Sequence, residues 1–351
     1  MAVDASTFLA GPRGRHLCLA VAHRLHQPVG RAWTEAAWRP GDAARRDALR
    51  AALREVDASP AARWDDLFAL VDPMDGTVSA AMGWQEPHDE DVVAADPTLL
   101  PLLEPIAAAL GRAPATQWWA TGLDLATVRY ADRYDEQSPA AAAGPETTGI
   151  GERLAQLRAE EDEGERRARA ERPDDPRAAW SGHWWSTPTP AALPTTRALA
   201  EVGSVNLLWE EDSFGQWDAL VWGLHPVRSP RVFEIDGAEA WVELVRRYPL
   251  DVTWSRRQDW YRVTGTDSTW LIPDWQAVGR DFDAVHLSVL GYLNAATRRL
   301  QVGPGAATVL AGWDPDQTWW LTDILAPPTT AEHWRTDQEA GDVLHGWHLV
   351  T

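Results

Sequence analysis

The sequence predicts an α+β protein: a helical N-terminal region followed by a Trp-rich, mostly antiparallel sheet domain that carries a few helices. Three observations support this prediction. Apolar residues follow helical spacing through residues 1–134, the composition changes over residues 135–178, and short strand-like runs fill residues 179–351. The last region also holds 16 of the 22 tryptophans. We therefore expect two folded regions joined by a linker.

The N-terminal region contains four stretches with an apolar stripe at helical spacing. We expect helices over residues 15–26, 42–56, 59–71 and 96–110. The pair Ser59-Pro60 favours a helix start, because proline is tolerated at the first helical position. The pair Asp72-Pro73 is expected to end that helix, because proline lacks the N–H that would continue it. The acidic stretch 87–91 is expected to be a loop.

Residues 135–178 differ in composition from both neighbouring regions. Residues 135–148 are mostly Ala, Pro, Gly, Ser and Thr, whereas residues 152–172 carry 13 charged side chains. Only Leu154 and Leu157 are large apolar groups in the second stretch, so a helix there would be solvated on nearly all sides. We predict a linker that is part flexible chain and part charged helix.

Short runs rich in β-branched and aromatic residues alternate with helical patterns in the C-terminal region. Strands are expected over residues 205–209, 219–224, 231–235, 260–263, 269–272, 284–289, 307–311 and 318–321. Asp236 is placed to cap a helix that carries Trp241 and Leu244, and a short helix is expected after Pro273. For residues 291–299 the pattern leaves helix and strand open.

The charge of the chain argues against two classes of partner. The 52 acidic residues outnumber the 32 basic ones, which are all Arg, and give a net charge of −20. A nucleic-acid surface needs clustered basic residues, and the same deficit disfavours anionic membranes. No apolar stretch is long enough for a membrane span, and residues 1–9 lack the pattern of a secretory signal. We expect a soluble cytoplasmic protein that has no nucleic-acid or membrane partner.

The sequence motifs of common enzymes are missing. There is no P-loop, no dinucleotide-binding glycine pattern, no Gly-x-Ser-x-Gly and no His-Glu-x-x-His. The single cysteine, Cys18, excludes a zinc site built from cysteines. His23 and His26 are three residues apart, but the solvated side of an amphipathic helix accounts for both. No metal is expected.

The segment from Arg246 to His286 is the richest in side chains that bind ligands. The candidate ligand-binding residues there are Arg256, Arg257, Trp260, Arg262, Asp274 and His286. Arg offers a planar fork for phosphate or carboxylate, Trp a face for stacking and His a proton carrier, so together they suit a flat anionic ligand. The alternative is structural: the arginines pair with nearby acids while Trp fills the core. The acids available for such pairs are Glu239, Glu243, Asp251 and Asp259.

A further candidate, His183, lies in a segment rich in Ser, Thr and Trp. A His followed by hydroxyl groups early in a small α+β domain is similar to NAD-dependent ADP-ribosyltransferases. In that comparison His183 takes the first part, and Tyr261 or Thr264 the second. The family's late Glu has no match in a convincing strand after Glu243. NAD is a cofactor only under this comparison, and a plain Ser/Thr/Pro loop is the structural alternative.

Eight short segments are similar to segments of uncharacterised proteins from high-GC actinobacteria. They cover residues 11–15, 84–87, 211–215, 259–262, 273–275, 285–287, 291–293 and 311–315. No activity is assigned to such proteins. The resemblance therefore implies a cytoplasmic setting and carries over no catalytic residue.

These observations favour a binding protein over an enzyme. Trp and Arg dominate binding hot spots, so we expect a Trp- and Arg-rich surface on the C-terminal domain that binds a protein or a small anionic ligand. This hypothesis requires pairs of exposed tryptophans that form a large patch. The alternative is an enzyme acting on a nucleotide-like substrate, with ADP-ribosyl transfer as one form of it. That alternative requires the candidate residues to converge on one pocket.

Overall fold

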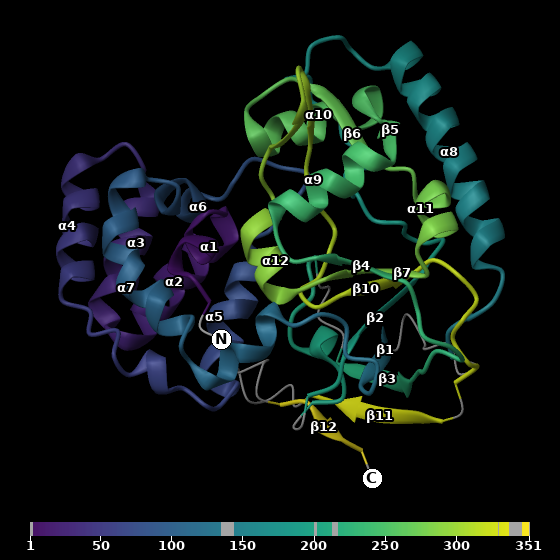
Figure 1. Ribbon diagram of the computed structural model, residues 1–351. Helices are drawn as coiled ribbons and strands as arrows, with labels where there is room; N and C mark the ends of the chain where they lie inside the picture. Colours follow the sequence, from purple (N-terminus) through teal and green to yellow (C-terminus); the bar gives the residue numbers. More distant parts are fainter. Residues whose placement is uncertain are drawn as a thin grey trace.

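The computed structural model describes residues 3–134, 144–199, 202–212, 217–328, 330–336 and 346–350. Helices fill the N-terminal part and two mostly antiparallel sheets fill the C-terminal part, so the α+β prediction is confirmed. Figure 1 shows the first helices gathered on one side of the molecule, with the sheets and their own helices on the other. No helix within the described ranges is long and apolar enough to cross a membrane.

The N-terminal part consists of short helices joined by tight connections. Its α-helices are α1 (Ala5–Leu9), α2 (Pro12–Leu25), α3 (Gln27–Trp38), α4 (Ala43–Arg54), α5 (Phe68–Ser79), α6 (Asp89–Ala94) and α7 (Leu100–Leu110). Its 3-10 turns are η1 (Ala61–Arg63), η2 (Pro97–Leu99) and η3 (Pro114–Ala120). Three of the four predicted helices are present with shifted ends. The Asp42 carboxylate caps α4 by accepting a hydrogen bond from the backbone N–H of Ala44 at 3.0 Å.

The prediction of a helix over residues 59–71 is wrong. The chain makes the turn η1 there, and α5 begins later, where the N–H of Phe68 donates to Asp66 Oδ1 at 2.9 Å. The helix then continues through Pro73 instead of ending before it. Proline costs one backbone hydrogen bond inside a helix, and the burial of Met74 and its apolar neighbours on α5 offsets that cost.

The acidic stretch 87–91 also differs from its prediction. It enters α6, whose first turn consists of Asp89, Glu90 and Asp91. Acidic residues are favourable at this end of a helix, because the unpaired N–H groups there carry partial positive charge. A cluster of acids before an apolar pair therefore started a helix where we expected a loop.

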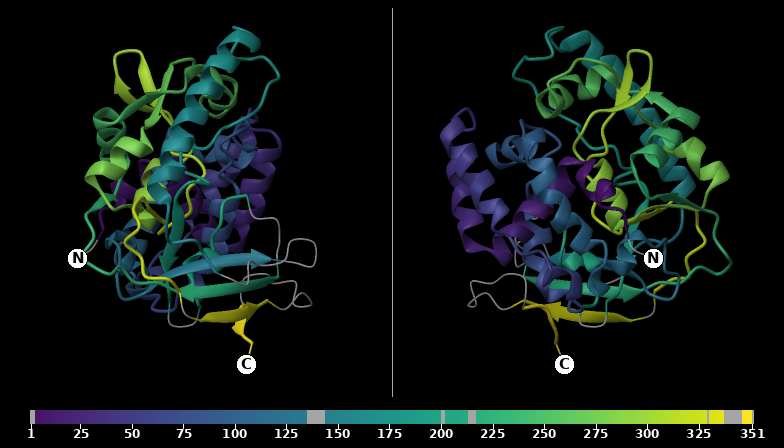
Figure 2. Two further views of the ribbon diagram at one scale, coloured as in Figure 1. Left: turned by 90° about the vertical axis from the view of Figure 1, so that its right-hand side faces the viewer. Right: turned by 60° about the vertical axis from the view of Figure 1, so that its left-hand side comes forward.

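Among the described residues, eight strands form one sheet in the order β12-β11-β3-β1-β2-β10-β7-β4, and four form another in the order β5-β6-β9-β8. The strands are β1 (Val128–Tyr134), β2 (Leu193–Arg197), β3 (Asp218–Gly223), β4 (Val232–Ile235), β5 (Pro249–Asp251), β6 (Thr269–Pro273), β7 (Ala284–Leu287), β8 (Leu300–Gly303), β9 (Ala306–Thr308), β10 (Thr318–Trp320), β11 (Ala331–Arg335) and β12 (His348–Leu349). Of the strand pairs in the described part of the chain, only β4–β7 and β6–β9 are parallel. Figure 2 shows β11 and β12 at the outer edge of the larger sheet.

The helices of the C-terminal part lie between and beside the strands. They are α8 (Ile150–Glu171), α9 (Ala238–Arg247), α10 (Thr253–Thr264), α11 (Trp275–Asp281) and α12 (Val289–Ala295), with the turn η4 (Val205–Leu207). The predicted strands 205–209 and 260–263 are therefore wrong, and the open segment 291–299 begins as a helix. The turn that ends α10 places Gly265 at φ 65°, where glycine is the favoured residue.

The predicted charged helix is present as α8, but it is not solvated on nearly all sides. Leu154 and Glu161 are buried, because α8 packs against α10 and α11. The stretch 135–143 lies outside the described residues. Strand β1 also joins the sheet from residues assigned to the helical region. The two predicted regions therefore share one sheet and one core.

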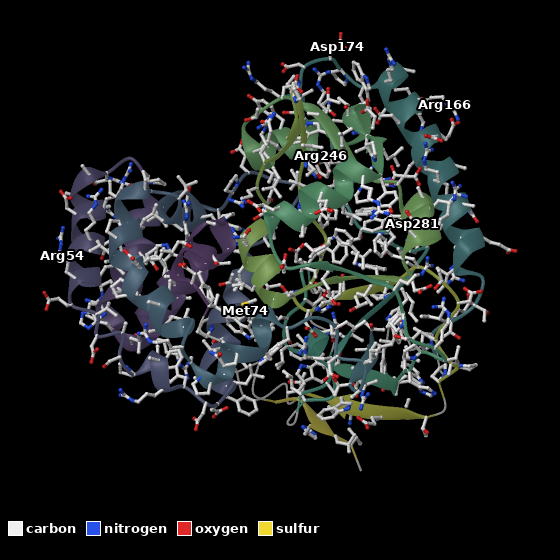
Figure 3. The ribbon with its side chains drawn as sticks, viewed as in Figure 1. Arg54, Met74, Arg166, Asp174, Arg246 and Asp281 are labelled. Carbon is white, nitrogen blue, oxygen red and sulfur yellow. The ribbon has the colours of Figure 1, made fainter. Side chains whose placement is uncertain are left out.

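The boundary between the two parts is closely packed. A side chain on Gly11 would place its Cβ only 2.4 Å from the carbonyl oxygen of Leu293, so α2 and α12 approach at a position that only glycine allows. Apolar residues from both parts form one continuous cluster. Figure 3 shows Met74 in the interior between the two parts, whereas Arg54 and Arg166 point away from the body of the molecule.

Tryptophan is mainly a core residue in this protein. Twelve of the 22 are buried, and only Trp38 and Trp180 are exposed. Trp313 lies at the centre of a cluster, with ring centroids 6.2, 6.1 and 6.4 Å from those of Trp241, Trp275 and Trp319. The expected patch of exposed tryptophan pairs is wrong, because both members of the adjacent pairs are buried or half-buried. Large indoles fill the space between the sheets and helices instead.

Candidate functional site

A polar cavity of about 140 Å³ opens beside the middle strands of the larger sheet. We name it the carboxyl pocket and define it by six of its lining residues. These are Arg129, Tyr130, Asn206, Glu210, Asp314 and Gln317. They come from β1, from η4 and the residues after it, and from the turn between β9 and β10. The pocket therefore combines three separate parts of the chain.

The turn that carries Asp314 is held by a buried ion pair. Asp316 has φ 63° and is only 1% exposed, and Arg197 on β2 contacts both of its carboxylate oxygens. The backbone N–H of Arg197 donates at 2.9 Å and its Nε at 2.7 Å. The Arg197 guanidinium also lies over the ring of Trp118 at 4.9 Å. This packing fixes the turn in a conformation that non-glycine residues seldom adopt.

Asp314 lies in the wall of the carboxyl pocket and is 7% exposed. Its Oδ1 accepts a hydrogen bond from the Glu211 N–H at 2.8 Å. Its Oδ2 accepts from Asn206 Nδ2 at 2.9 Å and from Gln317 Nε2 at 2.8 Å. These bonds favour the charged carboxylate, but burial and the neighbouring Glu210 carboxylate outweigh them and raise the pKa of Asp314 to about 7. Asp314 therefore exchanges a proton near neutral pH.

A second carboxyl group is buried next to Asp314. Glu211 accepts hydrogen bonds from the Tyr292 hydroxyl at 2.9 Å and from the Gly312 N–H at 2.9 Å. Burial, together with the Asp314 carboxylate, raises the pKa of Glu211 well above its ordinary value. Glu211 thus links Tyr292 on α12 to Gly312 in the turn after β9.

Three residues that line the pocket keep polar groups that the described fold does not engage. The only hydrogen bond that the Arg129 side chain donates to the described chain is to the carbonyl of Val128 at 3.1 Å, and this side chain pairs with no described carboxylate. The Tyr130 hydroxyl bonds to no described residue, and burial raises its pKa to about 12, so it stays protonated. Gln317 is 6% exposed, and its Oε1 has no partner in the described part of the chain. The pocket can therefore both donate and accept hydrogen bonds.

The predicted residues on α10 mainly hold the fold together. Arg256 is fully buried and donates to Glu161 Oε2 on α8 at 2.8 Å. Arg257 pairs with Asp267 at 2.8 Å, and the buried Trp260 donates to the Trp184 carbonyl at 2.8 Å.

Arg262 is the fourth candidate ligand-binding residue on α10. It pairs with Asp259 and donates to the Trp84 carbonyl at 2.9 Å. Of the four acids named as partners, only Asp259 pairs with a candidate arginine in the described chain. The structural alternative accounts for these four residues.

Asp274 and His286 lie away from that group. Asp274 caps α11 by accepting from the Ala277 N–H at 3.0 Å, and it pairs with Arg158 on α8 at 3.1 Å. His286 is buried in β7, where its Nδ1 lies 3.0 Å from Thr318 Oγ1 and its Nε2 lies 3.8 Å from Asp316 Oδ1. Burial lowers the pKa of His286. The seven candidates therefore do not converge on one pocket.

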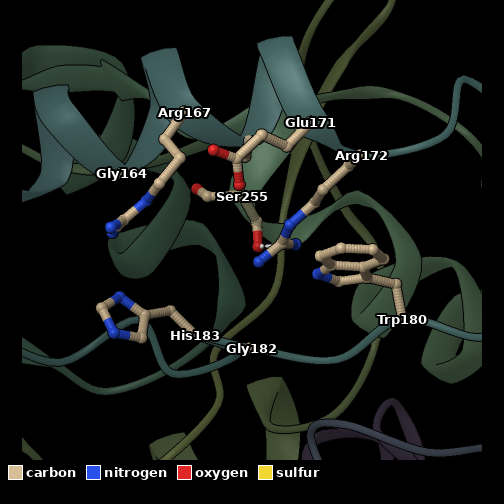
Figure 4. Close-up of a pocket in the computed structure, with 9 residues that line it drawn as sticks. Gly164, Arg167, Glu171, Arg172, Trp180, Gly182, His183 and Ser255 are labelled. Atoms are coloured by element: carbon tan, nitrogen blue, oxygen red, sulfur yellow. Dashed lines mark hydrogen bonds between the residues drawn. The ribbon is translucent and has the colours of Figure 1, made fainter.

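His183 lines a different cavity, of about 150 Å³. We name it the Arg–Trp pocket and define it by Arg167, Glu171, Arg172, Trp180, His183 and Ser255. Figure 4 shows Arg167 and Arg172 reaching from α8 toward the segment of Gly182 and His183. The His183 ring lies 4.7 Å from that of Trp185. Of the seven candidates, only His183 lines this cavity, although Arg256 lies near enough to lower the pKa of His183.

Comparison with protein-family models, curated proteins and solved structures finds no match for this chain. No group of three His, Cys, Asp or Glu side chains in the described residues is arranged to hold a metal ion. The carboxyl pocket was missed by sequence reasoning, which did not single out Glu210, Asp314 or Tyr130 as site residues. Asp314 and the neighbouring Glu211 lie in the short segments 311–315 and 211–215, which carry no diagnostic motif. Glu210 and Tyr130 had no sequence signal.

Asp314 is expected to make the unfolding free energy fall as the pH rises from about 4 to 8. Its pKa is about 7 in the folded chain, against roughly 3.9 in an unfolded chain, so the folded state binds more protons in this window. We expect Asp314→Asn to remove that component of the slope in urea unfolding at successive pH values. His286, with its lowered pKa, adds an opposite slope to both proteins, so it cancels in the difference between them. The difference reports Asp314 together with Glu211, because the Asp314 carboxylate helps to raise the pKa of Glu211. Equal slopes would contradict the raised pKa.

Proposed function

We propose that the protein is an enzyme that binds a small polar molecule in the carboxyl pocket and uses Asp314 as its general acid–base group. One observation carries this proposal: a carboxyl group that titrates near neutral pH lies in the wall of a polar cavity. A general acid–base works best when its pKa is close to the working pH, because both protonation states are then populated. Perturbed carboxyls in a cavity are typical of such sites.

The groups around Asp314 support binding as well as proton transfer. The Arg129 guanidinium supplies donors that the described chain leaves unengaged. Glu210 is held by an ion pair to Arg133 at 3.3 Å, which keeps a negative charge next to Asp314. A substrate hydroxyl, amide or carbonyl can then be oriented by Arg129 while Asp314 gives or takes a proton.

The size of the carboxyl pocket limits the substrate. Its volume of about 140 Å³ is roughly that of five water molecules, at about 30 Å³ each. Pockets for drug-sized ligands span roughly 300–1,000 Å³, so the carboxyl pocket surrounds only a small group. We therefore propose a small polar substrate in place of the nucleotide, and the proposal includes neither NAD nor ADP-ribosyl transfer.

Ligand-observed NMR with a panel of small polyols, amides and hydroxy acids tests this proposal. We expect at least one compound to receive saturation from the protein and to lose it with Arg129→Gln, because that arginine is unengaged by the fold. Arg112→Gln is the matched control, since Arg112 is exposed and outside the pocket. Turnover of the bound compound should fall about a hundredfold or more in Asp314→Asn. Binding that survives Arg129→Gln, or no binding by any compound, would contradict the proposal.

A further inference from the structure

The Arg–Trp pocket is a second cavity, built by α8 and the segment 180–183, and the proposed function does not use it. Its lining includes two arginines and a histidine, with Glu171 as the one carboxylate. This is an unusual local balance in a chain with a net charge of −20. Figure 4 shows the Arg167 guanidinium, the Arg172 guanidinium and the His183 ring around one open space.

Arg172 is held in place by the protein itself. Its Nη1 donates to the carbonyl oxygens of Ser255 at 2.7 Å and Trp254 at 3.4 Å, and its guanidinium lies 5.8 Å from the Trp180 ring centre. A Cβ at position 182 would lie 2.4 Å from Arg172 Nη2, so Gly182 makes room for the guanidinium. The cation is therefore oriented before any ligand arrives, which lowers the entropy lost on binding.

Arg167 and His183 line the rest of the cavity. Arg167 is exposed and forms no ion pair with any described residue, so the described fold does not neutralise its charge. Burial, and then the positive charges of Arg256, Arg172 and Arg167, lower the pKa of His183, although Glu161 acts in the opposite sense. An anion placed between these groups would relieve their repulsion.

We propose that the Arg–Trp pocket binds the phosphate group of a small molecule. Hydrogen-bond donors approach the cavity from two segments of the chain, the two arginines from α8 and its C-cap and His183 from residues 180–183, which suits a tetrahedral anion with several oxygens. A planar carboxylate is satisfied by a single guanidinium fork and leaves the other cationic groups without a partner. The volume of about 150 Å³ accommodates a phosphate group with few further atoms. This site is independent of the acid–base chemistry at Asp314.

Isothermal titration calorimetry of the full chain with inorganic phosphate, at fixed ionic strength, tests this inference. Arg167→Gln is expected to weaken binding about tenfold or more, because it removes a charge-assisted hydrogen bond. Glu171→Gln is expected to strengthen binding, because it removes the one carboxylate of the lining. Arg54→Gln makes the same charge change on α4 and is expected to leave binding as in the wild type.

Three outcomes would overturn the inference. One is the absence of phosphate binding up to about 10 mM, well above the roughly millimolar range of weak specific sites. Another is an equal loss of binding in Arg54→Gln and Arg167→Gln, which would reflect net charge alone. The third is acetate binding as tightly as phosphate, which would show that the pocket does not select a tetrahedral anion.

Discussion

Replacing Arg256 with Met is expected to lower the unfolding free energy by about 3–5 kcal/mol. Arg256 is fully buried and Glu161 is 7% exposed, so the substitution leaves a carboxylate in the interior without its cation. Methionine retains an apolar stem of similar length, which separates the loss of charge from the loss of packing. Urea unfolding followed by circular dichroism measures the change. A smaller loss, below about 1 kcal/mol, would mean that this pair does not hold α8 against α10.

The double variant Arg256→Met with Glu161→Leu shows whether the loss of stability comes from the unpaired Glu161 carboxylate or from altered packing. Replacing both partners of a buried ion pair with apolar residues is often neutral, so we expect this variant to recover most of the stability. Arg166→Met provides the control on the same helix, because Arg166 is 70% exposed and pairs with Glu163 on the surface. Its effect should stay within about 0.5 kcal/mol.

Trp313→Ala is expected to lower the unfolding free energy by about 3–5 kcal/mol. Trp313 is fully buried, and Trp241, Trp275 and Trp319 surround it, so its removal leaves a cavity that its large neighbours cannot easily fill. Trp38→Ala is the matched control, because that indole is 81% exposed. The same urea unfolding assay should show almost no change for Trp38→Ala. Similar losses for both variants would contradict the assignment of Trp313 to the core.

Much of the fold could be predicted from the sequence, because helix spacing and strand composition are local properties. The α+β order, α2, α4 and most strands of the C-terminal part follow from patterns within about ten residues. The wrong predictions concerned single segments. The run around Trp260 has the composition of a strand, but its polar neighbours Arg256 and Asp259 are buried by partners on other segments, which makes a helix there stable. Tertiary contacts overrode the local preference.

The candidate site was less predictable. Sequence reasoning chose Arg256, Trp260 and His286 because their chemistry is versatile, but each is buried among partners that the sequence does not place nearby. The residues of the carboxyl pocket are ordinary in the sequence. Asp314 becomes unusual only because Glu210 and burial act on it together. The composition of one segment does not show that burial and a distant carboxylate will act on the same residue.

The sequence by itself determined the class of fold, the net charge of the chain and the number of tryptophans. Only the tertiary structure decided which charges are buried and where the carboxyl groups meet. Tyr292 and Glu211 are 81 residues apart in the sequence, Glu211 and Asp314 are 103 apart, and Arg256 and Glu161 are 95 apart. Local patterns specify backbone conformation over a few turns, whereas such pairs depend on the path of the whole chain. The same reason explains why the tryptophans, abundant enough to suggest a surface, lie mostly in the core.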